Sequence, residues 1–236
     1  LAANLLELGL RHGDRVVIMM PTSPLWEYCQ LAILSVGGIV IGLDAHDAPR
    51  NIRHILELTQ PRLVFTGSAE QLALISANWM RPEISIVASG LDANTPALDL
   101  DSLFKPCGKA VQCPAPAPDQ IATIVFTSGS TGQPKAFGFP EDKQWAMAMN
   151  LAAHVPFTAA DKVLCPVSFT HGHGYIMSLP FLLLGATVFY LHPELLQPEN
   201  MAEYIEKHQL TIMTGVPFQY NRFLESAAKP DALRTL

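Results

Sequence analysis

The residues best suited to chemistry lie in one short segment, which runs from Thr127 to Lys135 and reads Thr-Ser-Gly-Ser-Thr-Gly-Gln-Pro-Lys. Glycine lets a backbone approach a ligand closely and adopt positive φ. Backbone N–H groups and hydroxyl groups donate hydrogen bonds to phosphate oxygens, and a lysine adds a mobile positive charge. The segment predicts a phosphate-binding loop, with an ordinary polar surface loop as the alternative. The candidate ligand-binding residues are Thr127, Ser128, Gly129, Ser130, Thr131, Gly132 and Lys135.

The spacing of these residues differs from two familiar nucleotide-binding motifs. A Walker A loop has four residues between its glycines, followed directly by Lys and then Ser or Thr. Here Gly129 and Gly132 are three positions apart, Lys135 follows three positions later, and Ala136 comes next. The G-x-G-x-x-G fingerprint of dinucleotide-binding proteins is also absent from the segment. An ordinary P-loop NTPase and a Rossmann dehydrogenase are therefore both disfavoured.

Composition excludes several other classes of protein. The chain has 236 residues, of which 49% are hydrophobic, so it can build a large core in one or two domains. Its formal net charge is −6 and no block of Lys and Arg occurs, which argues against a nucleic-acid partner. The apolar stretch 176–190 is interrupted by Pro180 and Gly185, so we expect no membrane span. No signal sequence is evident, and we expect a cytoplasmic protein.

The four cysteines do not indicate a metal site. Cys29, Cys107, Cys113 and Cys165 lack the paired spacing of a zinc site. In a chain without an export signal we expect reduced thiols with structural or incidental roles. His171 and His173 are two positions apart, but no third ligand is evident near them, so we predict no metal bound by the protein itself.

Strand-like and helix-like segments alternate along most of the chain, and this alternation predicts an α/β fold. We expect helices over 1–8, 24–36, 48–58, 69–77, 141–153, 175–184, 198–208 and 217–227. We expect strands over 15–20, 39–43, 63–66, 84–88, 121–126, 162–165, 186–191 and 211–214. The predicted architecture is two mostly parallel sheets flanked by helices.

A proline-rich stretch divides this pattern. Residues 92–118 contain five prolines and few periodic apolar positions, which predicts a connecting segment. We therefore expect a first α/β subdomain over 1–91 and a second, incomplete one over 119–236 that carries the phosphate loop. In open α/β sheets, ligands bind beyond the carboxyl ends of the strands. The phosphate loop, residues 171–174 and residues 215–217 all follow predicted strands, so we expect them to converge on one rim.

Several of these segments together resemble one family. The stretch Phe126 to Ala136 matches an aromatic residue followed by T-S-G-[ST]-T-G-x-P-K-G, except that Ala136 stands where glycine is typical. Gly13-Asp14-Arg15-Val16, His171-Gly172-His173-Gly174 and Val216-Pro217 are similar to further elements of the same family, in the same order. The chain thus resembles the acyl-adenylate-forming (AMP-binding) superfamily, which includes acyl-CoA ligases, luciferases and the adenylation domains of peptide synthetases.

The resemblance implies a reaction and a set of cofactors. In that family a small carboxylic acid attacks the α-phosphate of ATP, giving an acyl-adenylate and pyrophosphate. A thiol, from coenzyme A or from the pantetheine of a carrier protein, then takes the acyl group. Magnesium is expected to accompany ATP. By resemblance, His171 lies near the acyl and α-phosphate site in a catalytic role, and His171, Gly174, Val216 and Pro217 border the substrate pocket.

The family's later motifs have no counterpart in this sequence, including Tyr-Gly-x-Thr-Glu and a lysine in a mobile C-terminal domain. We therefore interpret the chain as an interior fragment of the large N-terminal domain of such an enzyme, with little activity alone. Three hypotheses follow. The leading one is an acyl-CoA ligase. The second is an adenylation domain that loads a carrier protein. The third is a non-catalytic nucleotide-binding module that has kept the fold.

Overall fold

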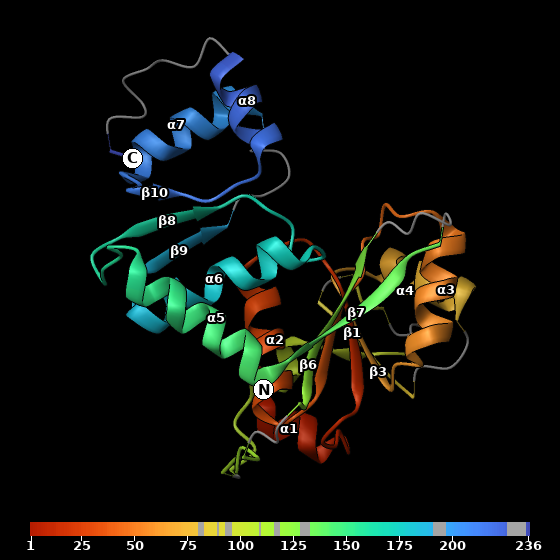
Figure 1. Cartoon of the computed structure of the whole chain (residues 1–236). Helices are drawn as coiled ribbons and strands as arrows, with labels where there is room; N and C mark the ends of the chain where they lie inside the picture. The colour runs from red at the N-terminus through yellow and green to blue at the C-terminus, as the bar shows by residue number, and fades with distance from the viewer. Residues whose placement is uncertain are drawn as a thin grey trace. The chain divides into compact units, whose positions relative to one another are not determined.

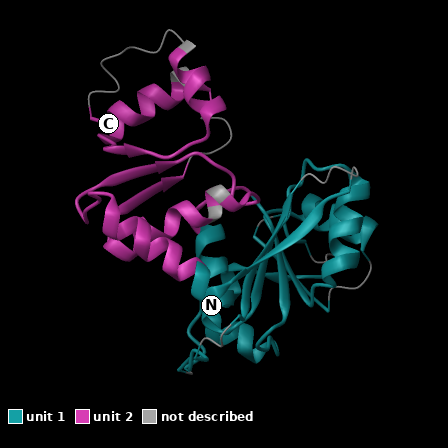
Figure 2. Ribbon diagram, viewed as in Figure 1, with its two compact units in different colours: residues 1–20, 25–143 teal, residues 21–24, 144–236 magenta. Residues whose placement is uncertain are grey.

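The structure of the protein is a computed structural model that describes residues 1–79, 83–88, 90–92, 96–108, 110–115, 119–127, 133–190, 197–225 and 235–236. The chain forms two compact units (Figure 2). The first comprises residues 1–20 and 25–143, and the second comprises residues 21–24 and 144–236. Each unit contains one sheet, so the predicted α/β fold with two mostly parallel sheets flanked by helices is confirmed.

The first unit is built around a seven-stranded sheet with the order β5-β4-β3-β1-β2-β6-β7. Figure 1 labels β1, β3, β6 and β7 of this sheet. Its strands are β1 (Arg15–Met19), β2 (Ile39–Gly42), β3 (Leu63–Thr66), β4 (Ile84–Val87), β5 (Leu98–Asp99), β6 (Ile121–Thr127) and β7 (Lys135–Pro140). Its helices are α1 (Ala2–Glu7), α2 (Pro24–Ser35), α3 (Pro49–Thr59), α4 (Ala69–Asn78) and the 3₁₀ turn η1 (Asp101–Phe104). All neighbouring strands pair in parallel except β6 and β7, which are antiparallel.

The core of this unit follows from the apolar strands at the centre of the sheet. Val16 to Met19 of β1 and Leu63 to Phe65 of β3 are completely buried, as expected for parallel strands covered on both faces. Helix α3 buries residues at helical spacing, namely Ile52, Ile55, Leu56 and Thr59. Ile52, Ile55 and Leu56 join one cluster with residues of β1, β2 and β3, and Ile124 and Phe126 of β6 pack against that cluster.

Strand β6 is where the structure differs from the expected division of the chain. The sequence predicts that residues 121–126 open a second subdomain, whereas β6 pairs in parallel with β2 of the first sheet. Apart from residues 21–24, the chain passes from the first unit to the second between Lys143 and Gln144, within α5 (Glu141–His154), and not in the proline-rich stretch. That stretch contains β5 and η1, both packed onto the first unit. Local periodicity cannot reveal which strand β6 pairs with, because this depends on contacts distant in sequence.

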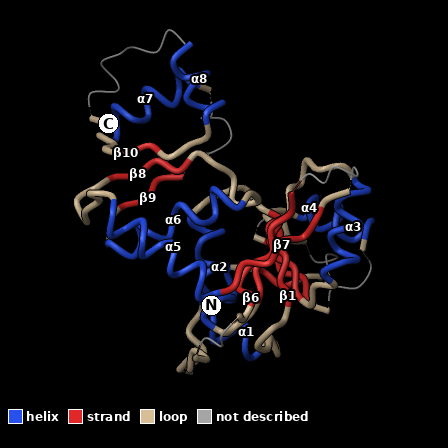
Figure 3. The backbone as a smooth tube through the Cα atoms, in the orientation of Figure 1, coloured by secondary structure: helices blue, strands red, loops and turns tan. Residues whose placement is uncertain are grey.

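The second unit contains a three-stranded parallel sheet with the order β10-β8-β9 (Figure 3). Its elements after α5 are β8 (Lys162–Cys165), α6 (Gly172–Leu184), β9 (Thr187–Tyr190), α7 (Pro198–His208), β10 (Ile212–Met213) and α8 (Pro217–Glu225). Alternation along β8 separates two clusters. Leu164 packs with Met201, Ile205 and Phe223 of α7 and α8, while Val163 and Cys165 pack with Phe181 of α6. The sheet is thus covered by helices on both faces.

Candidate functional site

Strands β6 and β7 hold the two ends of the predicted phosphate loop next to each other. Thr127 ends β6, Lys135 begins β7, and the two residues are paired in the antiparallel register. Both are exposed. The predicted ligand-binding residues Ser128, Gly129, Ser130, Thr131 and Gly132 lie outside the described residues. The loop is therefore the connection of a β-hairpin whose first strand lies within the parallel sheet.

Lys135 is available for an anionic ligand. Its side chain makes no hydrogen bond or ion pair with the part of the chain that the structure describes. The residue before it is fixed by a contact from outside the hairpin, because Nε2 of His54 on α3 lies 3.1 Å from the carbonyl oxygen of Pro134. A carbonyl oxygen can only accept, so this nitrogen donates and must carry the proton. Helix α3 thus anchors the hairpin immediately before the lysine.

His171, the predicted catalytic residue, lies at the start of helix α6 in the second unit. It is the N-cap residue, with extended φ and ψ of −108° and 141°, and its backbone N–H donates to the carbonyl oxygen of Ser168 at 3.2 Å. The side chain makes no cap hydrogen bond and is exposed. Its imidazole is therefore free to meet a ligand, as far as the described residues show.

Gly174 permits α6 to begin where it does. The residue is buried in the first helical turn, against the segment that follows β8. A Cβ atom at this position would lie 2.7 Å from the carbonyl oxygen of Val167 and closer still to that of Ser168. Because both obstacles are backbone atoms, no side chain can be accommodated without moving the helix away from the strand. The glycine three residues after His171 is thus explained by close packing.

The segments that contain His171 and Val216 lie at the same edge of the second sheet. Strand β8 leads into residues 166–171, and its neighbour β10 leads into Val216 and Pro217, where α8 begins. Since β8 and β10 are parallel, the segments after them emerge at one edge. Val216 is half-buried and Pro217 is exposed. The phosphate loop follows a strand of the other sheet, so its convergence with this edge stays a prediction.

Two polar side chains that the sequence analysis missed fix these segments. Gln219 on α8 accepts a hydrogen bond from the N–H of Val216 at 3.1 Å and donates one to the carbonyl oxygen of Pro166 at 3.2 Å. The hydroxyl of Thr22 accepts from the N–H of Phe169 at 2.9 Å. No sequence pattern points to either residue, because Pro166 and Phe169, the partners that place them, are distant in sequence.

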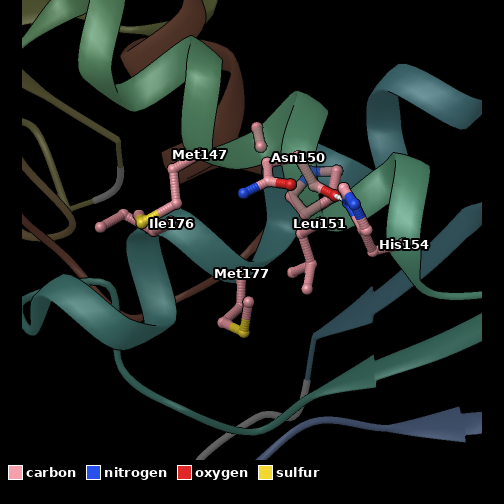
Figure 4. Close-up of a pocket in the computed structure, with 8 residues that line it drawn as sticks. Met147, Asn150, Leu151, His154, Ile176 and Met177 are labelled. Carbon is pink, nitrogen blue, oxygen red and sulfur yellow. Dashed lines mark hydrogen bonds between the residues drawn. The ribbon is translucent and has the colours of Figure 1, made fainter.

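An apolar groove lies between α5 and α6 of the same unit, with a volume of about 550 Å³ (Figure 4). Side chains from both helices line it, and Figure 4 shows Met147 beside Ile176, with Leu151 and Met177 nearby. Its polar groups come from Asn150 and His154 on α5. The full lining is Met147, Ala148, Asn150, Leu151, His154, Ile176, Met177 and Pro180. None of the residues predicted for the substrate pocket lines it, but it begins five positions after His171 along the same helix.

The ionisable groups near these elements are perturbed by burial and hydrogen bonding. Burial raises the pKa of Tyr220, whose hydroxyl donates to the carbonyl oxygen of Met213 at 2.8 Å. The pKa of Asp161 is lowered, first by the hydroxyl of Thr211 at 2.8 Å and then by the N–H and hydroxyl of Thr158. Both groups support the framework of the second sheet and neither touches the groove.

Other features bear on cofactors and on the membrane. Within the described ranges no three His, Cys, Asp or Glu residues are grouped so that they could hold a metal ion. All four cysteines are free thiols. In the portion of the chain that the structure covers, no helix combines the length and the apolar character needed to traverse a bilayer.

Comparison with known proteins identifies the family. The family described as AMP-binding enzyme matches residues 1–236, the whole of the chain. This protein therefore belongs to the AMP-binding enzymes, and the resemblance drawn from its motifs is confirmed.

Curated relatives include ligases and peptide synthetases. The chain is 27% identical over 245 residues to 3-[(3aS,4S,7aS)-7a-methyl-1,5-dioxo-octahydro-1H-inden-4-yl]propanoyl:CoA ligase of Mycobacterium tuberculosis, covering 98% of this chain and 46% of that protein. It is 29% identical over 247 residues to tyrocidine synthase 2 of Brevibacillus parabrevis, covering 100% of this chain and 6% of that protein. It is 27% identical to a 3-hydroxybenzoate/4-hydroxybenzoate CoA ligase of Thauera aromatica, covering 97% and 44%. The chain thus spans about half the length of the CoA ligases it matches.

Solved structures share the fold. ATP-bound MatB of Rhodopseudomonas palustris superposes with a TM-score of 0.82 at 21% identity, covering 98% of this chain and 45% of that one. A benzoate CoA ligase of Burkholderia xenovorans superposes with a TM-score of 0.82 at 20% identity, covering 97% and 45%. At these identities the likeness establishes the fold alone.

Proposed function

We propose that the complete protein activates a carboxylic acid with ATP, releases pyrophosphate and transfers the acyl group to a thiol. Membership of the AMP-binding enzymes supports the adenylation step. The structural observation that carries the proposal is the pairing of Thr127 with Lys135 at the ends of the loop. A hydroxyl donor beside an ammonium group that has no partner among the described residues is suited to phosphate oxygens, which accept hydrogen bonds and carry negative charge.

The residues around the loop fit ATP better than a metal ion bound by the protein itself. Thr127 offers a hydroxyl and Lys135 an ammonium, and neither is a carboxylate that would favour Mg²⁺. We propose that magnesium arrives with the nucleotide and is held through its phosphate oxygens. The lysine would then offset negative charge that develops on the phosphates as the carboxylate attacks.

We further propose that the groove between α5 and α6 takes the apolar part of the acid. Its volume of about 550 Å³ suits a small ligand, and its walls are mainly methionine, leucine, isoleucine and proline side chains. His171 lies at the N-terminus of the helix that forms one wall. A neutral imidazole there can border the path of the carboxylate, with Gly174, Val216 and Pro217 shaping the backbone around it.

The thiol that accepts the acyl group distinguishes an acyl-CoA ligase, the leading candidate, from an adenylation domain that loads a carrier protein. The relatives include CoA ligases and also tyrocidine synthase 2 and an L-proline:prolyl-carrier-protein ligase of Streptomyces coelicolor. We propose coenzyme A as the acceptor, because several relatives matched over nearly the whole of this chain are named as CoA ligases. The prolyl-carrier-protein ligase is matched over a similar share of its own length, 44%, so the choice of acceptor is made by assay. Loading of a carrier protein is the alternative. The predicted cytoplasmic location is part of the same proposal.

A panel of carboxylic acids tests this function in the complete protein. Each acid is assayed for ATP–pyrophosphate exchange, which reports adenylation without a thiol. Acids that support exchange are then offered coenzyme A or a pantetheinylated carrier, and the acylated product is detected by mass spectrometry. Exchange followed by acyl-CoA formation is the expected result. Transfer to the carrier alone selects the second candidate, and no exchange with any acid leaves a non-catalytic nucleotide-binding module.

A further inference from the structure

Gln219 connects two backbone segments that follow neighbouring strands. Its Oε1 atom accepts from the N–H of Val216, and its Nε2 atom donates to the carbonyl oxygen of Pro166. Val216 follows β10, and Pro166 opens the segment that leads from β8 to His171. One side chain therefore spans the distance between the turn at Val216 and the segment that ends at His171.

The surroundings of Gln219 hold it in this position. The hydroxyl of Tyr220 donates to the carbonyl oxygen of Met213, which fastens the first turns of α8 to β10. Gly215 packs closely against the side chains of Gln219 and Tyr220. A Cβ atom at position 215 would lie 3.1 Å from Oε1 of Gln219 and 3.3 Å from the ring of Tyr220. A side chain at position 215 would have to displace the amide. The local packing thus leaves room for the amide group of Gln219.

The chemistry of the bridge requires an amide. An uncharged amide accepts at its oxygen and donates at its nitrogen, so one terminal group can serve both backbone partners, and Asn is one methylene shorter than Gln. The hydroxyls of Ser and Thr also donate and accept, but they sit on shorter side chains. Glu could still accept from Val216, but it would place a carboxylate against the carbonyl oxygen of Pro166. Lys and Arg could donate to that oxygen but could not accept from Val216. Leucine would fill similar space and leave both backbone groups without this partner.

We propose that Gln219 is a positioning residue, which sets the spacing between the His171 segment and the Val216–Pro217 turn. It acts through these backbone segments and does not itself touch the reacting atoms. The inference rests on the proposed function, since it treats these two segments as the borders of the acid site. Loss of the bridge should therefore impair use of the acid more than binding of ATP.

The test compares Gln219→Leu and Gln219→Glu with wild type and with Thr214→Val in the complete protein. Thr214→Val removes a different tether between the same two strands, the hydrogen bond from the Thr214 hydroxyl to the carbonyl oxygen of Leu164 at 3.2 Å. It therefore controls for a general loss of stability. Kinetic constants for acid and ATP, melting temperature and amide hydrogen exchange are measured for all four proteins.

We expect Gln219→Leu to lower kcat/KM for the acid by about tenfold to a hundredfold, as for other small misplacements of site groups. The KM for ATP should change by less than about twofold, and hydrogen exchange should accelerate at Val216 and over residues 167–171. Gln219→Glu should preserve protection of the Val216 N–H yet match the leucine variant in acid kinetics. Thr214→Val should keep wild-type constants for both substrates.

Two outcomes would overturn the inference. One is a Gln219→Leu variant with wild-type acid kinetics. The other is an equal fall in kcat/KM for acid and for ATP, together with a drop in melting temperature like that of Thr214→Val. Failure of the proposed function looks different, because wild type itself would then give no pyrophosphate exchange. In that case amide hydrogen exchange still tests whether Gln219 holds the two segments together. Exchange rates at Val216 and at residues 167–171 that are the same in Gln219→Leu and wild type would contradict the bridge.

Discussion

His54 and Pro134 are joined across 80 positions of sequence by a 3.1 Å contact between an imidazole Nε2 atom and a carbonyl oxygen. The contact ties α3, a core helix of the first unit, to the residue immediately before Lys135. Pro134 has no N–H of its own, so its carbonyl group is the one backbone hydrogen-bonding group through which this residue can be held. The position of the lysine thus depends on a helix far from it in sequence.

Replacement of His54 by Leu tests this dependence. Removing one hydrogen bond of about 0.5–1.5 kcal/mol should raise the KM for ATP by about twofold to tenfold and leave the KM for the acid unchanged. Pyrophosphate exchange at varied ATP gives the measurement. His46→Leu is the matched control, because the His46 side chain is 95% exposed and, among the described residues, is paired with Asp44 close by in sequence. Equal effects of the two variants would contradict the proposed anchor.

Lys135→Ala should lower the rate of adenylation strongly. The substitution removes the ammonium group next to Thr127, and charged hydrogen bonds contribute about 1.5–3 kcal/mol, which corresponds to roughly a tenfold to hundredfold loss in kcat/KM for ATP. Lys105→Ala is the control, since Lys105 is also exposed and lies in the same unit. Activity equal to wild type in Lys135→Ala would remove the main support for nucleotide binding at the hairpin.

Filling the groove between α5 and α6 should change which acids are accepted. Leu151→Trp adds bulk to its wall, so acids with large apolar groups should lose activity while the smallest acids keep it. Met149→Trp is the control on the same helix, because Met149 is 59% exposed and does not line the groove. The panel of acids described above provides the readout. An unaltered profile for Leu151→Trp would place the acid elsewhere.

The cysteines should differ sharply in reactivity. Burial raises the pKa of Cys29 to about 12, and the residue is fully buried, whereas Cys113 is exposed. Because the thiolate is the reactive form, alkylation at pH 8 should modify Cys113 and spare Cys29 in the folded protein. Peptide mapping after iodoacetamide treatment gives the measurement, with a urea-unfolded sample to show that Cys29 reacts once exposed. Early modification of Cys29 would contradict its place in the core.

Asp161 should make stability depend on pH in the acidic range. Hydrogen bonds from Thr211 and Thr158 lower its pKa below the ordinary value of 3.8, so the folded state favours the carboxylate. The stabilisation is present above the unfolded pKa and is lost as pH falls through the lowered folded pKa. Asp161→Asn should therefore melt earlier than wild type at pH 7, with the difference shrinking below about pH 4. A constant difference over this range would point to another cause.

Strands and helices with strong local patterns were predictable from the sequence, and elements defined by distant partners were not. The apolar run at the start of the hairpin predicts a strand over 121–126, and β6 extends over Ile121–Thr127. Strand β7 was missed, because Lys-Ala-Phe-Gly-Phe-Pro contains a glycine and ends in proline, both unfavourable in strands. The alternation of Phe137 and Phe139 was its only local signal.

In the candidate site too, features with a local sequence pattern were predictable and features set by distant contacts were not. Motif spacing predicted a phosphate-binding loop after residues 121–126 and a His171–Gly174 element, whose roles in a site stay predictions. Close packing explains the glycine at position 174, whereas the pairing of β6 with β7 around the loop was not predicted. The sequence could not identify three side chains that hold these segments in place, namely Gln219, Thr22 and His54. Each bonds a backbone group far away in sequence, and only the fold brings the two together. The groove was also unpredictable, since it arises where two separate helices meet.

Gly174 has a consequence for engineering the groove that we propose as the acid site. Carbonyl oxygens of the preceding segment occupy the space that any larger residue at 174 would need. Randomised libraries directed at the opening turn of α6 should therefore yield mostly misfolded variants. The opposite wall of the groove, on α5, has exposed positions such as Met147 and Asn150 that face no such obstacle. Diversity introduced there offers a more productive route to new substrate scope.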